Sequence, residues 1–162
     1  GLYNVGEYSF APYKVVWREI STGFQSAVVD EHELAEDISK PVIPDHKLMQ
    51  IPFESKNAAH FVCGVLNSVI SRFIVHSYTV STQLSTHILE NVPVPKFSGK
   101  NQRHTEIAKL SRQAHQIVLE KDDSDGLAVV EEKIDTLVAE LFEINTGNLT
   151  AIRKELDYLE EL

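Results

Sequence analysis

The first half of the chain contains three short runs rich in β-branched and aromatic residues, separated by polar breaks. This composition predicts β-strands. The runs are residues 14–20, 24–29 and 47–53. Pro44 and Pro52 bound the third run, and proline at such positions favours an edge or terminal place in a sheet. The polar stretch 30–37 predicts a loop or a short acidic turn of helix.

Beyond Phe53 the spacing of apolar residues changes from that of a strand to that of a helix. Ser55 can cap a first helix and Ser68 a second one, so the pair Asn67-Ser68 predicts the break between them. The apolar positions of the two helices are Ala58, Ala59, Phe61, Val62 and Leu66, then Ile70, Phe73 and Ile74.

The rest of the chain divides into a polar connection and a helical tail. Residues 78–86 are rich in Ser and Thr, and the extended segment 92–95 carries two prolines that end the first domain. The tail shows three apolar patterns at helical spacing, with a turn at 121–126 and an Asn148 cap before the third. The sequence therefore predicts an α+β fold, with a small mixed or antiparallel sheet and helices in residues 1–100 and a C-terminal helical extension in residues 101–162.

Charge divides the chain in a similar way. Residues 1–102 hold 8 Lys and Arg against 10 Asp and Glu, whereas residues 103–162 hold 7 against 14. The net charge of −9 argues against a free-standing nucleic-acid binder, because affinity for DNA comes largely from neutralising phosphates. The objection is weaker for the first segment if its basic side chains gather on one face.

The chain shows no sign of export or membrane insertion. No apolar stretch reaches the roughly 18 residues needed to span a bilayer. Cys63 is the single cysteine, which excludes an intrachain disulfide and a metal site built on several thiolates, and which fits a reducing cytoplasm. Since the chain starts at Gly1 and has Met49 as its single methionine, we expect it to be an N-terminally truncated part of a longer protein.

One enzymatic pattern stands out. Asp45, followed by Glu54-Ser55-Lys56, imitates the two carboxylates and the lysine of a metal-dependent nuclease, in which the acids hold Mg²⁺ and the lysine orients water. Pro52 and the Ser55 cap would split Glu54 from Lys56 at a strand-to-helix turn. The alternative is therefore two solvated charges at the boundary of an element.

Histidine, glycine and serine show no catalytic spacing. No two of the seven histidines lie four residues apart beside an acidic partner, the glycines form no phosphate cradle, and no serine stands in a nucleophile elbow. We expect no catalytic residue, no metal site and no cofactor site in this chain. The histidines are His32, His46, His60, His76, His87, His104 and His115.

The hydroxyl-rich loop 77–87 is the remaining candidate for ligand contact. Ser and Thr side chains suit phosphate contacts, and Gln83 could read an adenine edge. The alternative is a capping or turn function.

Five segments, in this order and spacing, resemble one family. They are residues 10–18 (FAPYKVVWR), 42–47 (VIPDHK), 65–68 (VLNS), 85–91 (STHILEN) and 93–97 (PVPKF). The series resembles the C-terminal target-recognition region of adenine-N6 DNA methyltransferases of the TaqI-like and fused restriction-modification kind. It also resembles target-recognition domains of type I specificity subunits. The similarity covers about residues 8–143.

The resemblance implies a division of labour within a parent chain. An upstream methyltransferase domain, absent here, binds S-adenosylmethionine and methylates a flipped-out adenine, whereas the downstream region clamps the double-stranded DNA and reads bases. This chain lacks the catalytic motifs, so we expect it to be no enzyme by itself. The parent is then an adenine-specific methyltransferase of a restriction-modification or phage-defence system, with or without a fused endonuclease.

Seven residues are candidates for contacting DNA on this hypothesis. The phosphate candidates are Lys14, Arg18, Lys47 and Arg72, and the base or backbone candidates are Gln83, Ser85 and His87. Each has a structural alternative: Arg18 can cover Trp17, and Arg72 can pair with a neighbouring carboxylate. Two other functions stay open, a nuclease that uses Asp45, Glu54 and Lys56, and a protein-interaction module that acts through the acidic helical tail.

Overall fold

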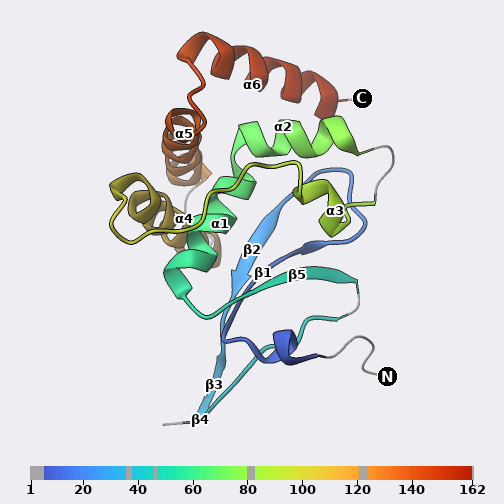
Figure 1. Ribbon diagram of the computed structural model, residues 1–162, viewed down its shortest axis with the longest axis vertical. Helices are drawn as coiled ribbons and strands as arrows, with labels where there is room; N and C mark the ends of the chain where they lie inside the picture. The colour runs from blue at the N-terminus through green and yellow to red at the C-terminus, as the bar shows by residue number, and fades with distance from the viewer. Residues whose placement is uncertain (1–5, 36–37, 46, 80–82, 121–123, 162) are drawn as a thin grey trace.

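A three-stranded antiparallel sheet lies in the N-terminal half of the molecule (Figure 1). The computed structural model describes residues 6–35, 38–45, 47–79, 83–120 and 124–161. The strands are β1 (Tyr13–Arg18), β2 (Ser26–Val29) and β5 (Leu48–Phe53), and they pair in the order β2-β1-β5. β2 and β5 fall within the predicted apolar runs, and β1 begins one residue before its run, so the predicted α+β fold class is confirmed.

A second pairing projects from this sheet. Strands β3 (His32–Ala35) and β4 (Ile38–Lys40) form an antiparallel hairpin, at the lower end of the molecule in Figure 1. The prediction of a loop or an acidic helical turn over 30–37 was therefore wrong for residues 32–35, whereas residues 36 and 37 lie outside the described residues. Glutamate has a low strand propensity, but Glu33 pairs with Ser39 of β4, and propensity alone does not reveal such pairing.

Helix α1 (Lys56–Asn67) covers one face of the sheet, and it starts and ends where the sequence predicts. Ser55 Oγ accepts a hydrogen bond from the Ala58 N–H at 3.3 Å, and Ser68 Oγ accepts one from the Ser71 N–H at 3.3 Å. Ser68 thereby ends α1 and caps α2 (Val69–Tyr78). These caps form because a serine side chain replaces the missing carbonyl partner of the first helical N–H groups.

Side chains of α1 and α4 cover the free edge of β2. Asn67 Oδ1 accepts from the Ser26 N–H and Asn67 Nδ2 donates to the Ser26 carbonyl, both at 2.8 Å. Two residues further along the strand, the Val28 N–H donates to His115 Nε2 at 2.9 Å. The helices thus satisfy main-chain groups that would otherwise offer a template for pairing with another strand.

The opposite edge, on β5, is protected by proline. The Val28 N–H points away from β1, so the neighbouring pair, Val29 and Lys14, is the one that exchanges main-chain hydrogen bonds. The N–H and carbonyl of Lys14 therefore point toward β2 and away from β5. Pro52 stands opposite Lys14 and hence faces the outer side of β5. Because proline has no N–H, this position offers no donor to a further strand, in line with the expected edge position.

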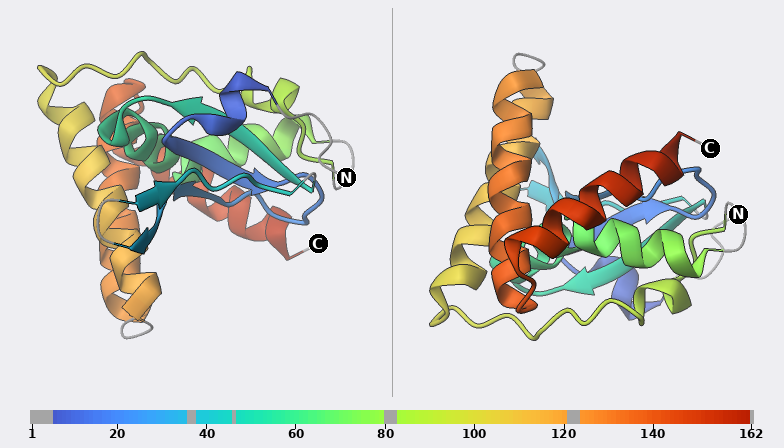
Figure 2. Two further views of the ribbon diagram at one scale, coloured as in Figure 1. Left: turned by 90° about the horizontal axis from the view of Figure 1, so that it is seen from below. Right: turned by 90° about the horizontal axis from the view of Figure 1, so that it is seen from above.

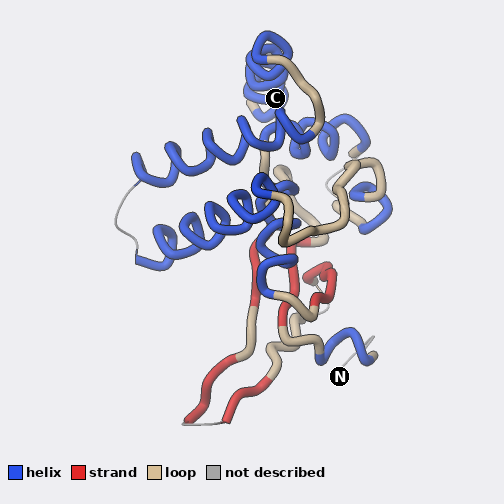
Figure 3. Tube along the Cα trace, turned by 60° about the vertical axis from the view of Figure 1, so that its left-hand side comes forward, coloured by secondary structure: helices blue, strands red, loops and turns tan. Residues whose placement is uncertain are grey.

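The C-terminal part is helical, as predicted. It consists of α4 (Gln102–Glu120), α5 (Ser124–Leu141) and α6 (Thr146–Glu160). Figures 2 and 3 show α4 and α5 lying side by side as a long hairpin that extends beyond the sheet, while α6 lies along α2. Part of the predicted turn at 121–126 lies outside the described residues, and α5 has already begun at Ser124.

The cap of the last helix differs from the prediction. Asn145 begins α6, with its Oδ1 accepting from the Asn148 N–H at 2.9 Å, so the prediction of Asn148 as the cap was wrong. Either asparagine has the side chain for this role. The choice follows from Ile144, which packs against the core and sets where the chain can turn into the helix.

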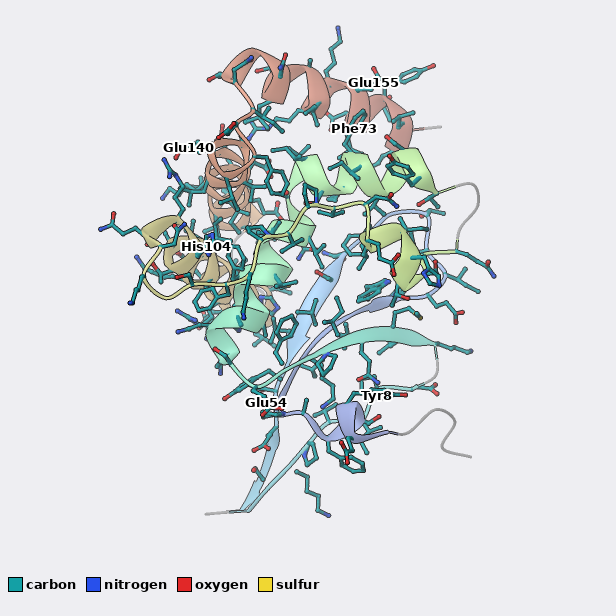
Figure 4. All side chains as sticks on the ribbon, viewed as in Figure 1. Tyr8, Glu54, Phe73, His104, Glu140 and Glu155 are labelled. Atoms are coloured by element: carbon teal, nitrogen blue, oxygen red, sulfur yellow. The ribbon has the colours of Figure 1, made fainter. Side chains whose placement is uncertain are left out.

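The tail helices share one core with α1 and α2. Phe73 of α2 points toward α6 in Figure 4, and the ring of Phe61 stacks on His104 of α4 with centroids 4.3 Å apart. The buried members of this core are Phe61, Val65, Val69, Ile70, Ile107, Ala108, Leu110, Val130, Ile134, Val138, Ala139, Leu149 and Leu156. Helices α4, α5 and α6 therefore pack on the first part of the chain and on each other.

No single helix among the described residues is long and apolar enough to cross a membrane. Helices α1 and α2 have the length and apolar composition of a membrane span only when they are taken together, and they meet at a bend of 66°.

Candidate nucleic-acid interface

Three of the predicted DNA contacts come together at the end of the sheet where β1 turns into β2. Arg18 pairs with Leu48 across β1 and β5, the Glu19 N–H donates to the Lys47 carbonyl at 3.0 Å, and Ile20 forms a bridge with Gln83. We call this region the turn end; it comprises residues 18–25, 47–48 and 83–85. The side chains of Arg18, Lys47 and Gln83 are all exposed there.

The position of Gln83 is fixed by the core beneath it. The indole N–H of Trp17 donates to the Leu84 carbonyl at 2.7 Å, and the Leu84 N–H donates to the Glu19 carbonyl at 2.7 Å. Leu84 itself is only 4% exposed. A buried tryptophan therefore anchors a segment 67 residues away in the sequence, so that the neighbouring Gln83 is presented on a rigid support. Residues 80–82 of the predicted hydroxyl-rich loop lie outside the described residues.

Ser85 and His87 flank the same end. Ser85 precedes the short helix α3 (Thr86–Leu89), and the buried Leu89 holds this helix on the core. The His87 side chain is 84% exposed, and its Nδ1 lies 3.3 Å from a carboxylate oxygen of Glu90. Both residues thus follow Gln83 closely in the chain, Ser85 half-buried and His87 exposed.

Lys14 lies in the interior, away from this surface. It is 1% exposed, and its ammonium donates to the Ala11 carbonyl at 2.6 Å. Burial lowers the pKa of Lys14, and the charge of Glu31 opposes this effect. A DNA phosphate cannot reach the ammonium in this conformation. Lys14 and Arg18 lie on the same face of β1 because they are an even number of residues apart. Lys14 is nevertheless buried, because 3₁₀ helix η1 (Glu7–Phe10) and the residues after it adjoin its end of the sheet.

Arg72 pairs with a carboxylate, which was the structural alternative. Its guanidinium binds Glu160 of α6, in a hollow that the β1–β2 turn lines from the other side. The basic residues at the turn end are therefore Arg18 and Lys47. Arg18 is next to Glu19 in the chain, and Lys47 is two residues from Asp45. The turn end is therefore a mixed polar surface with two exposed cations, and it is not a continuous basic strip.

The β1–β2 turn also belongs to this surface, although no sequence pattern predicted this. Ser21, Thr22, Gly23 and Gln25 form part of the turn end and line the hollow near Arg72. A Cβ added at Gly23 would meet no atom within 4 Å, so open space lies above the turn. The Ser-Thr-Gly run between two strand patterns is a recognisable turn signal, but no feature of the sequence alone places it beside Arg72.

The nuclease residues do not converge. Asp45 and Glu54 lie at opposite ends of the six-residue strand β5, which separates them by roughly 20 Å at the usual rise of a strand. Figure 4 shows Glu54 where β5 leads into α1. Lys56 is engaged with Asp30, 2.8 Å away. Two carboxylates must lie within a few ångströms of each other to share a metal ion, so this geometry does not favour the nuclease.

Two histidines lie together near β2: His60 is buried and His115 is half-buried. The rings of His60 and His115 lie 4.9 Å apart, and His60 Nδ1 contacts Ser111 Oγ at 3.1 Å. His115 accepts from Val28 through Nε2 and donates to the Ser111 carbonyl through Nδ1 at 2.7 Å. No group of three His, Cys, Asp or Glu within the described ranges could hold a metal ion.

Cys63 lies close to these histidines and is a core residue. Burial raises the pKa of its thiol to about 11, although hydrogen bonds from Ser26 and Ser111 act in the other direction. A nucleophilic cysteine needs a lowered pKa and access to a substrate. Cys63 has neither.

No protein-family model and no curated protein matches this chain. The case for a function therefore depends on the residues and geometry described above.

Proposed function

We propose that this chain is the DNA sequence-recognition module of an adenine-specific DNA methyltransferase in a restriction-modification or phage-defence system. One observation carries the proposal: main-chain pairing brings Arg18, Lys47 and Gln83, from three separate segments, to the turn end of the sheet, where all three side chains are exposed. Two exposed cations and an amide at one end of a sheet suit a duplex, in which phosphates are held by Arg and Lys and an adenine edge is read by Gln.

The roles follow from the chemistry of each side chain. Arg18 and Lys47 hold backbone phosphates and set the orientation of the module, Gln83 reads the adenine edge in the major groove, and Ser85 and His87 contact the backbone or a neighbouring base. Extruding an adenine costs a few kcal/mol, which such contacts have to supply. Lys14 is left out of this set because it is buried.

The methyl donor belongs to another part of the parent protein in this proposal. S-adenosylmethionine would bind the methyltransferase domain, which also carries out the transfer, while this chain supplies DNA contacts. We expect the isolated chain to show no S-adenosylmethionine binding by calorimetry and no methylation or magnesium-dependent cleavage of DNA. Donor binding in the micromolar range would contradict this, as would cleavage that is lost in Asp45→Ala.

Variants of the turn end should separate affinity from specificity. Arg18→Ala and Lys47→Ala should each weaken binding to every duplex by a similar factor. Each should also reduce the salt slope, which is the slope of the logarithm of the binding constant against the logarithm of the salt concentration, by about one, because each removes one phosphate contact. Gln83→Ala should instead reduce the preference for a cognate over a scrambled duplex, by about 1–3 kcal/mol. The measurement is a fluorescence titration of both duplexes at several salt concentrations, starting near about 50 mM, where phosphate contacts are strongest.

Lys133→Ala is a suitable control, since it removes an exposed lysine from the C-terminal helix α5. Unchanged binding in all three turn-end variants would show that DNA does not contact this surface. The second candidate function would then gain support, because α4 and α5 expose Val118, Leu119 and Val129 at 59%, 77% and 52%. Exposed apolar side chains of this size suit contact with another protein surface, as expected of an interaction module built on the helical tail.

A further inference from the structure

A polar hollow lies between the β1–β2 turn, helix α2 and the last turn of α6. It has a volume of about 420 Å³, with Ser21, Thr22 and Gly23 on one wall and Arg72 on another. The carboxylate of Glu160 enters it from α6 and pairs with the Arg72 guanidinium. These two side chains are 35% and 32% exposed, so the ion pair is accessible to solutes.

The lining residues of this hollow include Arg72, Ser21 and Thr22, together with the acidic residues Glu131 and Glu160. Arginine, serine and threonine hydroxyls and main-chain N–H groups are the common partners of phosphate oxygens. A carboxylate and a phosphodiester both present two oxygens to a guanidinium. Glu160 therefore marks the place where an anion sits on Arg72.

The hollow is continuous with the turn end. A smaller adjoining hollow of about 160 Å³ shares the walls formed by residues 21–24, Arg72 and Glu160, and it extends to Leu84. Leu84 is the residue that carries the neighbouring Gln83 on the core. A duplex held by Arg18 and Lys47 would thus pass close to Arg72.

We propose that this hollow is a phosphodiester-binding site, in which the Glu160 carboxylate occupies the position that a backbone phosphate takes on Arg72 when DNA binds. The inference rests on the proposed function. It adds a phosphate contact to the DNA interface. It also identifies the end of α6 as the segment that has to move so that a phosphate can reach Arg72.

The carboxylates around Arg72 explain why Glu160 has to move away from the guanidinium before DNA can bind there. Burial raises the pKa of Glu131 and of Asp135, and the charge of Arg72 acts against this rise in both. Asp135 is fixed in place, since it accepts from the Val69 N–H at 2.8 Å and from Arg153 at 3.2 Å. With three carboxylates around it, Arg72 exerts little net attraction on DNA. Glu160, the last residue of α6, is the carboxylate that can move away.

The test is a double-mutant cycle on Glu160 and Arg72 in this chain, with duplex DNA as the probe. Glu160→Gln should tighten binding about three- to fivefold, because an exposed ion pair is worth up to about a factor of five in an equilibrium constant. Arg72→Ala should weaken binding and reduce the salt slope by about one. In the Arg72→Ala background, Glu160→Gln should have no further effect.

Glu155→Gln is the matched control, because it removes the same charge from the outer side of the same helix (Figure 4). It should change binding by less than half as much as Glu160→Gln. Equal gains in the two variants, or a gain from Glu160→Gln that persists without Arg72, would overturn the proposal in favour of general electrostatics. DNA binding that depends on Arg18 and Lys47 but on neither Arg72 nor Glu160 would reject this site alone, whereas no DNA binding by the unmodified chain would reject the proposed function with it.

Discussion

Replacing Asn67 by leucine is expected to lower the free energy of unfolding by about 3 kcal/mol. Asn67 satisfies the N–H and the carbonyl of Ser26, both at 2.8 Å, and also accepts from the Ser26 hydroxyl at 3.0 Å. Ser26 is 5% exposed, so water cannot readily replace the lost partners. Leucine has a similar size, so the loss reports unpaired main-chain groups rather than a cavity.

Urea unfolding at neutral pH measures this loss directly, and for a chain of this length it corresponds to a fall in Tm of about 6–12 °C. Asn57→Ala is the control on the same helix. Asn57 is exposed and contacts the side chain of Arg112, so its replacement should change stability by less than about 0.5 kcal/mol. Similar losses in the two variants would mean that the edge of β2 does not depend on Asn67.

Mild acid is expected to destabilise the fold through His60. Burial is the largest cause that lowers the pKa of His60 to about 3, followed by electrostatic interactions with His115, Arg112 and Lys56, while Asp30 acts in the other direction. In the unfolded chain His60 takes up a proton near its ordinary value of 6.5. Between these two values the unfolded state holds one more proton than the folded state.

The contribution of His60 to stability is therefore complete above pH 6.5 and is lost as the pH falls toward 3. The free energy of unfolding should fall by up to about 1.4 kcal/mol for each pH unit in this window. His60→Gln keeps a partner for Ser111 Oγ and removes the titrating ring, so the difference in stability between the unmodified chain and this variant should shrink or reverse as the pH falls.

The measurement is a series of urea unfolding curves between pH 7.5 and 4.5, compared between the unmodified chain and the variant. His87→Gln, at an 84% exposed imidazole, is the matched control and should retain the slope of the unmodified chain because His60 is still present. A difference between the unmodified chain and His60→Gln that stays constant over this range would show that His60 does not couple folding to pH.

The Leu66-Asn67-Ser68 run, which contributed to the family resemblance, has a structural explanation in this chain. Leu66 lies in the core at 2% exposure, Asn67 holds the edge of β2, and Ser68 caps α2. The run therefore supports the fold that positions the turn end, and it makes no direct contact with a ligand in our proposal.

The candidate interface was predicted from the sequence only in part. The positive charges of Arg18 and Lys47 and the amide of Gln83 predict phosphate and base contacts, and strand pairing and the bridge at Ile20 bring their segments to one end of the sheet. Lys14 was chosen by the same reasoning, but it is buried because its side chain turns back to the Ala11 carbonyl. Residue type alone does not distinguish a lysine that reaches solvent from one that satisfies a carbonyl inside.

The sequence by itself determined the elements whose causes are local. The caps at Ser55 and Ser68 involve partners three residues away. Strands β1, β2 and β5 follow from runs of β-branched and aromatic residues, and the long helices follow from the spacing of apolar residues, because only helical spacing buries them on one face. The tertiary structure decided the contacts between distant residues. Asn67 meets Ser26 across 41 residues, Trp17 meets Leu84 across 67, and Arg72 meets Glu160 across 88. Such pairs depend on how α1, α2 and α6 pack against the sheet and each other, and that packing results from the whole core rather than from any segment of the chain.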